Sequence, residues 1–414
     1  MIGTGVGVIL GALLYLAMAG DKIHLDAHFI GYLMAAIGVA SLLVLAHILS
    51  MTWPVLLQAE QYLTPRISEL AKKDGYRRFI IFVIIIFSLI SIVFSLDALV
   101  LNTLSKNVLI PVWVAFLGLA IDAVYLYSRQ ISNYLNPFEV TKLFFKEAEK
   151  SIQNDRELDM CDWIDAFSDV SNKAIDRNNI ALCNQSLDDM LQTIRLYLEA
   201  STSLAHANIE GQAKEKGISD RVSYSLFFLL HRYEMINENA AVKRLEPVSS
   251  HVMTNTGKVV LAAAKCDMSL SPHPLLFLGR FALTDIKHKI TEAGPKAICI
   301  LVGVAKSLLT DIDVRFLELQ ATFFSLIDQM KMISQEMFKQ DKTISIKILI
   351  QPFHDLKTFF ATEKMASHPD TPAILQQIDR VLQEFAALEA VLRTMPPIPK
   401  VSGVEAAEKL SKGL

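Results

Sequence analysis

Apolar residues are concentrated in the first third of the chain, in four stretches long enough to cross a bilayer. We expect membrane-spanning helices at residues 2–19, 29–53, 79–101 and 108–127. The loop at 54–78 carries five Lys and Arg residues, whereas the loops at 20–28 and 102–107 carry one each. Because positive residues stay on the cytoplasmic side, both chain ends are predicted to lie in the cytosol. A cleavable signal peptide over the first stretch is the alternative, although no Lys or Arg precedes it.

Polar side chains occur near the ends of these stretches. Asp122 and His47 each lie about six residues from the predicted cytoplasmic end of their helix, so a contact between them would offset the cost of burial. Snorkelling of Asp122 toward Arg129 is a second structural interpretation. The functional alternative is a proton or ion path lined by Asp122, His47, Tyr125 and Asp97. Positions near an interface favour a structural role, because a charge there reaches water without any function.

Three glycines of the first stretch, Gly3, Gly7 and Gly11, follow one another at intervals of four residues. Small residues at this spacing let two helices approach closely in lipid. We therefore predict a helix-packing face along the first span. Its partner is either a helix of the same chain, which we favour, or the same helix of a second copy.

Metal and thiol chemistry have only weak signals. His24 and His28 of the outer loop are four residues apart and could bind zinc, but a solvated turn is the simpler interpretation. An acidic helix face, comprising Asp159, Asp162, Asp165 and Asp169, lacks the glycine turn of a calcium loop, so a solvated face is favoured. The cysteines at 161, 183, 266 and 299 never form CxxC, and in a reducing cytosol we expect small buried apolar residues.

Residues 129–395 are predicted to form a mostly helical cytoplasmic domain, followed by a Pro-containing flexible tail at 396–414. Asn136-Pro137 is a helix start signal. Two heptad series predict long helices that resemble coiled coils and hold either one domain or an oligomer together. These are Phe316, Leu319, Phe323, Leu326, Met330, Ile333 and Met337, and Ile374, Ile378, Val381, Phe385, Leu388 and Leu392. Alternating isoleucines at 344–350 leave strand and helix equally open.

A short internal similarity relates two segments of this domain. Ser168-Asp169-Val170-x-x-Lys173 and then Ala181-Leu182-Cys183 match Thr284-Asp285-Ile286-x-x-Lys289 and then Ala297-Ile298-Cys299 at one offset. A duplicated helical hairpin would place each Asp–Lys pair on an exposed helix face and each triplet in the core. Coincidence is the alternative, and no further copies are present.

The composition and the absence of short motifs bear on function. The chain has 414 residues, a net charge of -3 and 52% hydrophobic residues, which indicates a membrane protein without a nucleic-acid footprint. Because no phosphate-binding, nucleophile or metal motif occurs, we expect no enzyme activity, no cofactor and no resident metal. We therefore predict an all-α integral inner-membrane protein that acts as an oligomeric scaffold or assembly component and docks protein partners through its cytoplasmic domain. A homo-oligomeric ion channel with a cytoplasmic vestibule is the alternative.

Overall fold

The computed structural model describes residues 2–19, 27–73, 75–97, 106–207, 212–314 and 317–394. Helices make up 89% of these residues and no strand occurs among them, so the predicted all-α class is confirmed. The chain divides into two compact units, Met1–Thr193 and Ile194–Leu414. The division falls well after the apolar helices, so unit 1 also contains polar helices.

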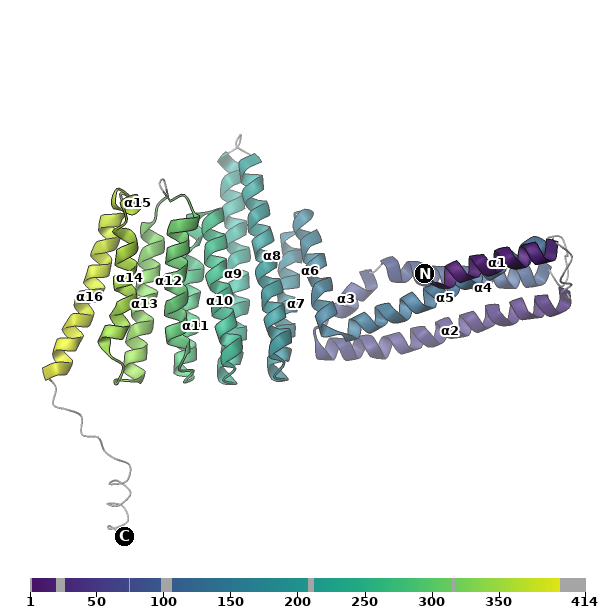
Figure 1. The fold of residues 1–414 in the computed structure, drawn as a ribbon, viewed down its shortest axis with the longest axis horizontal. Helices are drawn as coiled ribbons and strands as arrows, with labels where there is room; N and C mark the ends of the chain where they lie inside the picture. The colour runs from purple at the N-terminus through teal and green to yellow at the C-terminus, as the bar shows by residue number, and fades with distance from the viewer. Residues whose placement is uncertain are drawn as a thin grey trace, which may run out of the picture. The chain divides into compact units, whose positions relative to one another are not determined.

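Unit 1 begins with the apolar helices that Figure 1 draws in purple to blue. Its helices are α1 (Ile2–Ala19), α2 (Ala27–Tyr62), α3 (Arg66–Lys73), α4 (Gly75–Leu96), α5 (Lys106–Leu135), α6 (Pro137–Gln153) and α7 (Glu157–Asp176), and α8 (Ile180–Ala207) continues into unit 2. Helix α5 packs against α1, α2 and α4, and α2 also packs against α4. The four apolar helices α1, α2, α4 and α5 thus form one bundle.

Among the described residues, four helices are long and apolar enough to cross a membrane. Three belong to the bundle: His28–Tyr62, Arg77–Leu96 and Val108–Leu135. The fourth is α12 (Ala293–Asp311) of unit 2, where half of the apolar window is buried, compared with 28% to 39% in the other three. Helix α1 contributes a shorter apolar helix, Gly3–Leu16, among the described residues.

The bundle is apolar on its outside and holds polar groups inside. Large side chains such as Leu43, Trp53 and Phe79 are about 60% exposed. Inside, the Trp113 indole N–H donates to the Ser91 hydroxyl at 2.9 Å, and the hydroxyls of Thr52 and Tyr127 are 3.1 Å apart. The rest of the interior is mostly apolar, so the bundle differs from a water-soluble one in its apolar outer surface.

The predicted break after α5 is confirmed. The Asn136 side chain accepts a hydrogen bond from the Phe138 N–H at 3.1 Å, and Pro137 occupies the first position of α6. The Asn136 side chain thus satisfies one backbone N–H at the start of α6, and Pro137 has no N–H that needs an acceptor. The chain turns sharply here, so α6 leaves α5 at a steep angle (Figure 1).

Unit 2 is an array of antiparallel helices. After α9 (Gln212–Val242), it contains α10 (Glu246–Cys266), the 3-10 turn η2 (Met268–Leu270), α11 (Pro272–Lys287), α12, α13 (Gln320–Gln340), α14 (Ile346–Phe360), α15 (Glu363–Ala366) and α16 (Thr371–Thr394). From α9 to α13, each helix packs against the next helix and against the next but one. This pattern is typical of stacked helical pairs.

Four turns between helices share one left-handed conformation without glycine. Asp155, Asn178, Arg244 and Lys289 have φ between 55° and 64°. After each of them the next N–H bonds to a carbonyl five residues back, as from Asn179 to Ala174 and from Ile290 to Asp285. This is the Schellman pattern, in which glycine is the usual residue.

Residues 346–350 of the segment 344–350 form the start of a helix and no strand is present there, so the strand alternative is wrong. Helix α14 starts at Ile346, and its buried residues recur at intervals of three and four: Ile346, Leu349, Phe353, Leu356 and Phe360. The alternating isoleucines do not share one buried face, because Ile348 faces outward with 67% exposure. Pro352 lies inside the helix instead of ending the run.

The two heptad series are used inside unit 2. Leu319, Phe323, Leu326, Met330 and Ile333 are buried, as are Ile374, Ile378, Val381 and Phe385. Helix α13 packs against α11, α12 and α16, and α16 also packs against α14. Met337 and Leu388 are half-buried, and the side chains of Phe316 and Leu392 lie outside the described residues. The buried members of both series therefore pack within one chain.

The proposed internal repeat does not occupy equivalent positions. Lys173 lies within α7, whereas Lys289 lies in the turn after α11. Asp285 is fully buried and therefore not on an exposed face. Ala181 is exposed at the start of its helix, whereas Ala297 is buried. The Asp–Lys pairs and the triplets therefore do not share the exposed and buried positions expected of a duplicated hairpin.

Candidate functional site

The glycines of α1 pack against the backbone of α5. A Cβ atom at Gly7 would lie 3.0 Å from both the Gly118 Cα and the Val114 carbonyl oxygen, and one at Gly11 would lie 2.6 Å from the Pro111 carbonyl oxygen. A Cβ at Gly3 would lie 2.8 Å from the Gly118 oxygen. These contacts place the glycine face against a helix of the same chain, with no room for any side chain.

Asp122 caps the N-terminus of α1. Its carboxylate accepts hydrogen bonds from the Gly3 N–H at 2.9 Å, the Thr4 N–H at 2.8 Å and the Thr4 hydroxyl at 2.6 Å. The first N–H groups of a helix have no partner within the helix, and the helix dipole favours a negative charge there. Asp122 is 7% exposed, so these bonds compensate the burial of its charge.

The other predicted polar residues do not gather around Asp122. His47 and Tyr125 are exposed on the outside of the bundle, and Arg129 is also exposed. Asp97 is buried at the end of α4, which corresponds to the start of the antiparallel α5. Asp122 lies sixteen residues, roughly 24 Å, from the start of α5, so the two carboxylates are far apart. The expected contact of Asp122 with His47 or Arg129 is thus replaced by the cap on α1, because α1 brings its free N–H groups to that depth. His28 is exposed and His24 lies outside the described residues.

Two cations of α7 and its following turn bind the end of α2. The Lys173 ammonium donates to the Glu60 carbonyl oxygen at 3.0 Å, and the Arg177 guanidinium donates to the Tyr62 carbonyl oxygen at 2.9 Å. The Arg177 guanidinium also lies 4.3 Å from the centre of the Tyr62 ring. Carbonyls in the last turn of a helix carry partial negative charge, so cations are favoured there.

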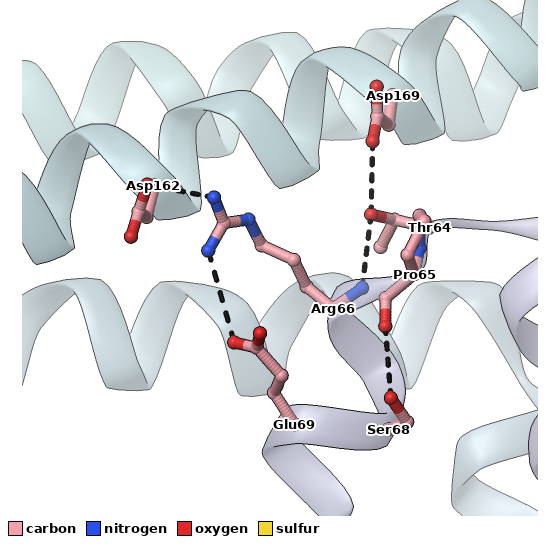
Figure 2. Close-up of polar contacts among 7 residues, drawn as sticks. All are labelled: Thr64, Pro65, Arg66, Ser68, Glu69, Asp162 and Asp169. Atoms are coloured by element: carbon pink, nitrogen blue, oxygen red, sulfur yellow. Dashed lines mark hydrogen bonds and ion pairs between the residues drawn. The ribbon is translucent and has the colours of Figure 1, made fainter.

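The start of α3 binds the acidic face of the same helix. Figure 2 shows the Arg66 guanidinium directed at Asp162 and the Thr64 hydroxyl directed at Asp169. The guanidinium donates to the Asp162 carboxylate at 2.7 Å, and the hydroxyl donates to the Asp169 carboxylate at 3.1 Å. The Thr64 oxygen also accepts from the Arg66 N–H at 3.4 Å, which caps α3. We call these contacts, with those of Lys173 and Arg177, the α7 clamp.

The α7 clamp changes the interpretation of the acidic face. Asp162 and Asp169 bind the loop between α2 and α4, and Asp159 pairs with Arg156 at 3.7 Å. This face was expected to be solvated, but half of it holds another segment of the chain. Among the residues that the structure describes, no group of three or more His, Cys, Asp or Glu could hold a metal ion.

Sequence reasoning missed the cationic half of the clamp. Lys173 and Arg177 lie more than a hundred residues from the carbonyls they bind, and a backbone carbonyl has no sequence signature. Their spacing of four residues, on a helix whose acidic residues face the same loop, was the available signal.

Burial strongly raises the pKa values of three ionisable groups in the described helices, and that of Asp189 reaches about 6. Burial raises the pKa of Asp285 to about 7, although the Asn237 amide donates to its carboxyl at 3.0 Å. Burial also raises the pKa of the Cys183 thiol to about 12, so this cysteine is not a nucleophile at neutral pH. Cys161 is buried too, Cys266 is half-buried and Cys299 is exposed, which differs from the expectation of four buried thiols.

The sequence matches no family model and no curated protein. Among solved structures, one described as "Circular tandem repeat protein with novel repeat topology and enhanced subunit contact surfaces" aligns over 86% of this chain and 99% of its own. The two are 15% identical and the TM-score is 0.20, which is too low for any shared fold. The description of stacked helical pairs rests on the contacts within this chain.

Proposed function

We propose that this chain is a membrane-anchored scaffold, in which α1, α2, α4 and α5 span the inner membrane and the later helices dock protein partners in the cytosol. The α7 clamp is the observation that carries this proposal. Through four hydrogen bonds it joins the end of α2 and the segment after it to α7 and the turn that follows α7, so that no free linker separates the anchor from α7. Such a fixed connection suits a protein that positions others.

The surface and interior of the bundle support an anchor. Its outer side chains are large and apolar, and its internal hydroxyls and carboxylates include several that are hydrogen-bonded within the bundle. In lipid, polar groups need such internal partners. We include α1 as a span, although it is short, because its glycines contact α5 from Gly3 to Gly11. We place α12 outside the membrane, because it packs against α10, α11, α13 and α14.

Cys299 allows a direct test of this arrangement. It is exposed on α12, whereas Cys161 and Cys183 are buried. In a Cys266→Ser background, a membrane-impermeant maleimide should label Cys299 only after the membrane is opened, and Cys299→Ser should abolish labelling. Labelling in intact cells would place unit 2 outside. Absence of labelling in opened membranes would place α12 in lipid.

The scaffold itself is tested by crosslinking in cells followed by purification in mild detergent. We expect reproducible crosslinks from surface lysines of unit 2 to one non-self protein. The matched pair of variants is Asp162→Arg, which opposes Arg66 with a like charge, and Glu149→Lys, which changes an exposed residue of α6. The first should weaken the crosslinks and Arg66→Asp should restore them, whereas Glu149→Lys should have no effect. The scaffold proposal would be contradicted if no crosslinks formed, or if crosslinks formed only to proteins within the membrane.

The alternative, a homo-oligomeric ion channel, would need polar residues that meet between copies. His47 and Tyr125 are two such side chains, because both are exposed on the bundle. Under this alternative, purified protein in planar bilayers conducts and His47→Ala alters the conductance. A scaffold gives silent bilayers at every voltage and pH.

A further inference from the structure

A cavity of about 500 Å³ lies between the C-terminal end of α5, helix α6 and the neighbouring α3, α4 and α7. Its polar lining includes Arg129 on α5 and Lys146, Glu147 and Lys150 on α6. Its apolar lining includes Leu70, Leu126, Leu143 and Trp163. We call it the α5–α6 pocket. The break at Asn136 creates it, because α6 turns away from α5 there.

The charges of the α5–α6 pocket do not balance. Glu147 is paired with Lys150, which leaves the cations Arg129 and Lys146. Neither has a hydrogen bond or ion pair to any residue that the structure describes. By contrast, Lys142 on the same helix is paired with Glu139 at 2.7 Å. Two unpaired cations that line one cavity attract an anion.

The walls of the pocket suit an amphiphile more than a free ion. Three leucines provide apolar surface, and the Trp163 ring stacks on Phe144 with 5.6 Å between ring centres. The Trp163 indole N–H makes no hydrogen bond to any described residue, so it remains a donor for an oxygen ligand. Tryptophan with an apolar body and one polar donor is typical of the membrane interface.

The position of the pocket matches the headgroup layer if the bundle spans the membrane as proposed above. The apolar run of α5 ends near Tyr127, and Arg129 follows within one turn. Leu126 therefore lies at the edge of the hydrocarbon, whereas Lys146 and Lys150 lie beyond it on the cytoplasmic side. A phosphate group at Arg129 and Lys146 leaves its acyl chains directed toward Leu126.

We propose that the α5–α6 pocket binds the phosphate group of an anionic phospholipid from the cytoplasmic leaflet. Arg129 and Lys146 hold the phosphate, the Trp163 N–H donates to a lipid oxygen, and the leucines contact the glycerol and upper acyl carbons. A second hollow shares Lys150 and Trp163 with the pocket and contains Arg66 and Asp162 of the α7 clamp. The bound lipid thus lies beside the contacts that fix the anchor to α7.

The test is native mass spectrometry of the full-length protein in a non-ionic detergent, titrated separately with phosphatidylglycerol, phosphatidylcholine and glycerol phosphate. We expect phosphatidylglycerol to be retained best. Arg129→Gln and Lys146→Gln should each weaken its binding about fivefold, the effect of one Lys or Arg on an anionic headgroup. Lys142→Gln, which removes the same charge outside the pocket, should leave binding unchanged. All three side chains are exposed, so the variants should fold, which their melting without lipid will verify.

Three outcomes would overturn the proposal. Equal binding of phosphatidylcholine would remove the role of charge, and equal loss with Lys142→Gln would make the effect one of overall charge. Binding of glycerol phosphate as tightly as the lipid would identify a site for a soluble phosphate. None of these outcomes depends on the orientation of the protein in the membrane. Labelling of Cys299 in intact cells would contradict the proposed function, but it would not change the lipid binding measured in detergent.

Discussion

The interface between α1 and α5 and the core of unit 2 are both closely packed, but they use opposite residues. Along α1, glycines bring two backbones into contact with no side chain between them. In unit 2, aromatic side chains fill the space between helices, as where Phe323 meets Phe360 edge to face at 4.9 Å. In water, burial of large apolar groups stabilises a fold through the hydrophobic effect. In lipid this effect does not act between helices, and close van der Waals packing stabilises their association instead. The contrast therefore agrees with the two solvents that we propose for the two regions.

The buried carboxylates show the same contrast. Asp122 accepts three hydrogen bonds from α1, two of them from backbone N–H groups that need an acceptor. Asp285 in unit 2 accepts one from Asn237, and its pKa is raised to about 7. Asp122 completes the interface in which it lies, whereas Asp285 is tolerated in a core that packing already stabilises.

The largest effect is expected in the aromatic core. Phe323→Ala should lower the free energy of unfolding of unit 2 by about 3–5 kcal/mol, because a fully buried ring leaves a cavity. Ile348→Ala on the exposed side of α14 should change it by less than about 0.5 kcal/mol. Denaturant titration of the purified protein, followed by circular dichroism, measures both. Equal losses would mean that large side chains do not stabilise this unit as described.

Asp285 predicts a dependence on pH. The folded chain keeps its proton up to about pH 7 while the unfolded chain loses it near 3.8, so stability falls as pH rises between these values and is constant above. The difference in unfolding free energy between wild type and Asp285→Asn should shift by about 3 kcal/mol in favour of the variant from about pH 5 to about pH 8. Asp220→Asn, on the exposed side of α9 in the same unit, controls for general effects of charge. A shift of the opposite sign would contradict a raised pKa.

The glycine interface predicts an effect of the opposite kind, in which adding one methyl group destabilises. Gly7→Ala should lower the free energy of unfolding of the detergent-solubilised protein by about 1–3 kcal/mol, as measured by its thermal unfolding. The new Cβ would meet the backbone of α5, which cannot move aside as a side chain can. Gly5→Ala on the same helix has nothing within 4 Å of the new Cβ and should be neutral or stabilising. If Gly5→Ala destabilises as much as Gly7→Ala, the face of α1 that contacts α5 is assigned incorrectly.

The features that followed from the sequence are those encoded by neighbouring residues. Helix periodicity, the cap at Asn136 and the buried series of α13 and α16 needed only local spacing. The α7 clamp and the cap at Asp122 could not be predicted, because each joins a side chain to a backbone group far along the chain. Alternation misled at Ile348, since a short run of apolar residues fits a strand and a helix equally well.

The left-handed turns between helices could not be predicted for another reason, which is that they lack glycine. They provide the prediction with the smallest expected effect. Lys289 has φ 64° in a Schellman turn where glycine is the usual signal, so the sequence gives no sign of it. Lys289→Gly should raise the unfolding free energy of unit 2 by about 0.5–1 kcal/mol, because a left-handed residue with a Cβ is strained by more than glycine loses in chain entropy. Lys287→Gly, the same change two residues earlier in the last turn of α11, should instead lower it by about 0.5–1 kcal/mol. Opposite signs from one substitution at neighbouring exposed positions would separate backbone strain from side-chain packing. If both variants are destabilised, the turn after α11 does not hold Lys289 in the left-handed region.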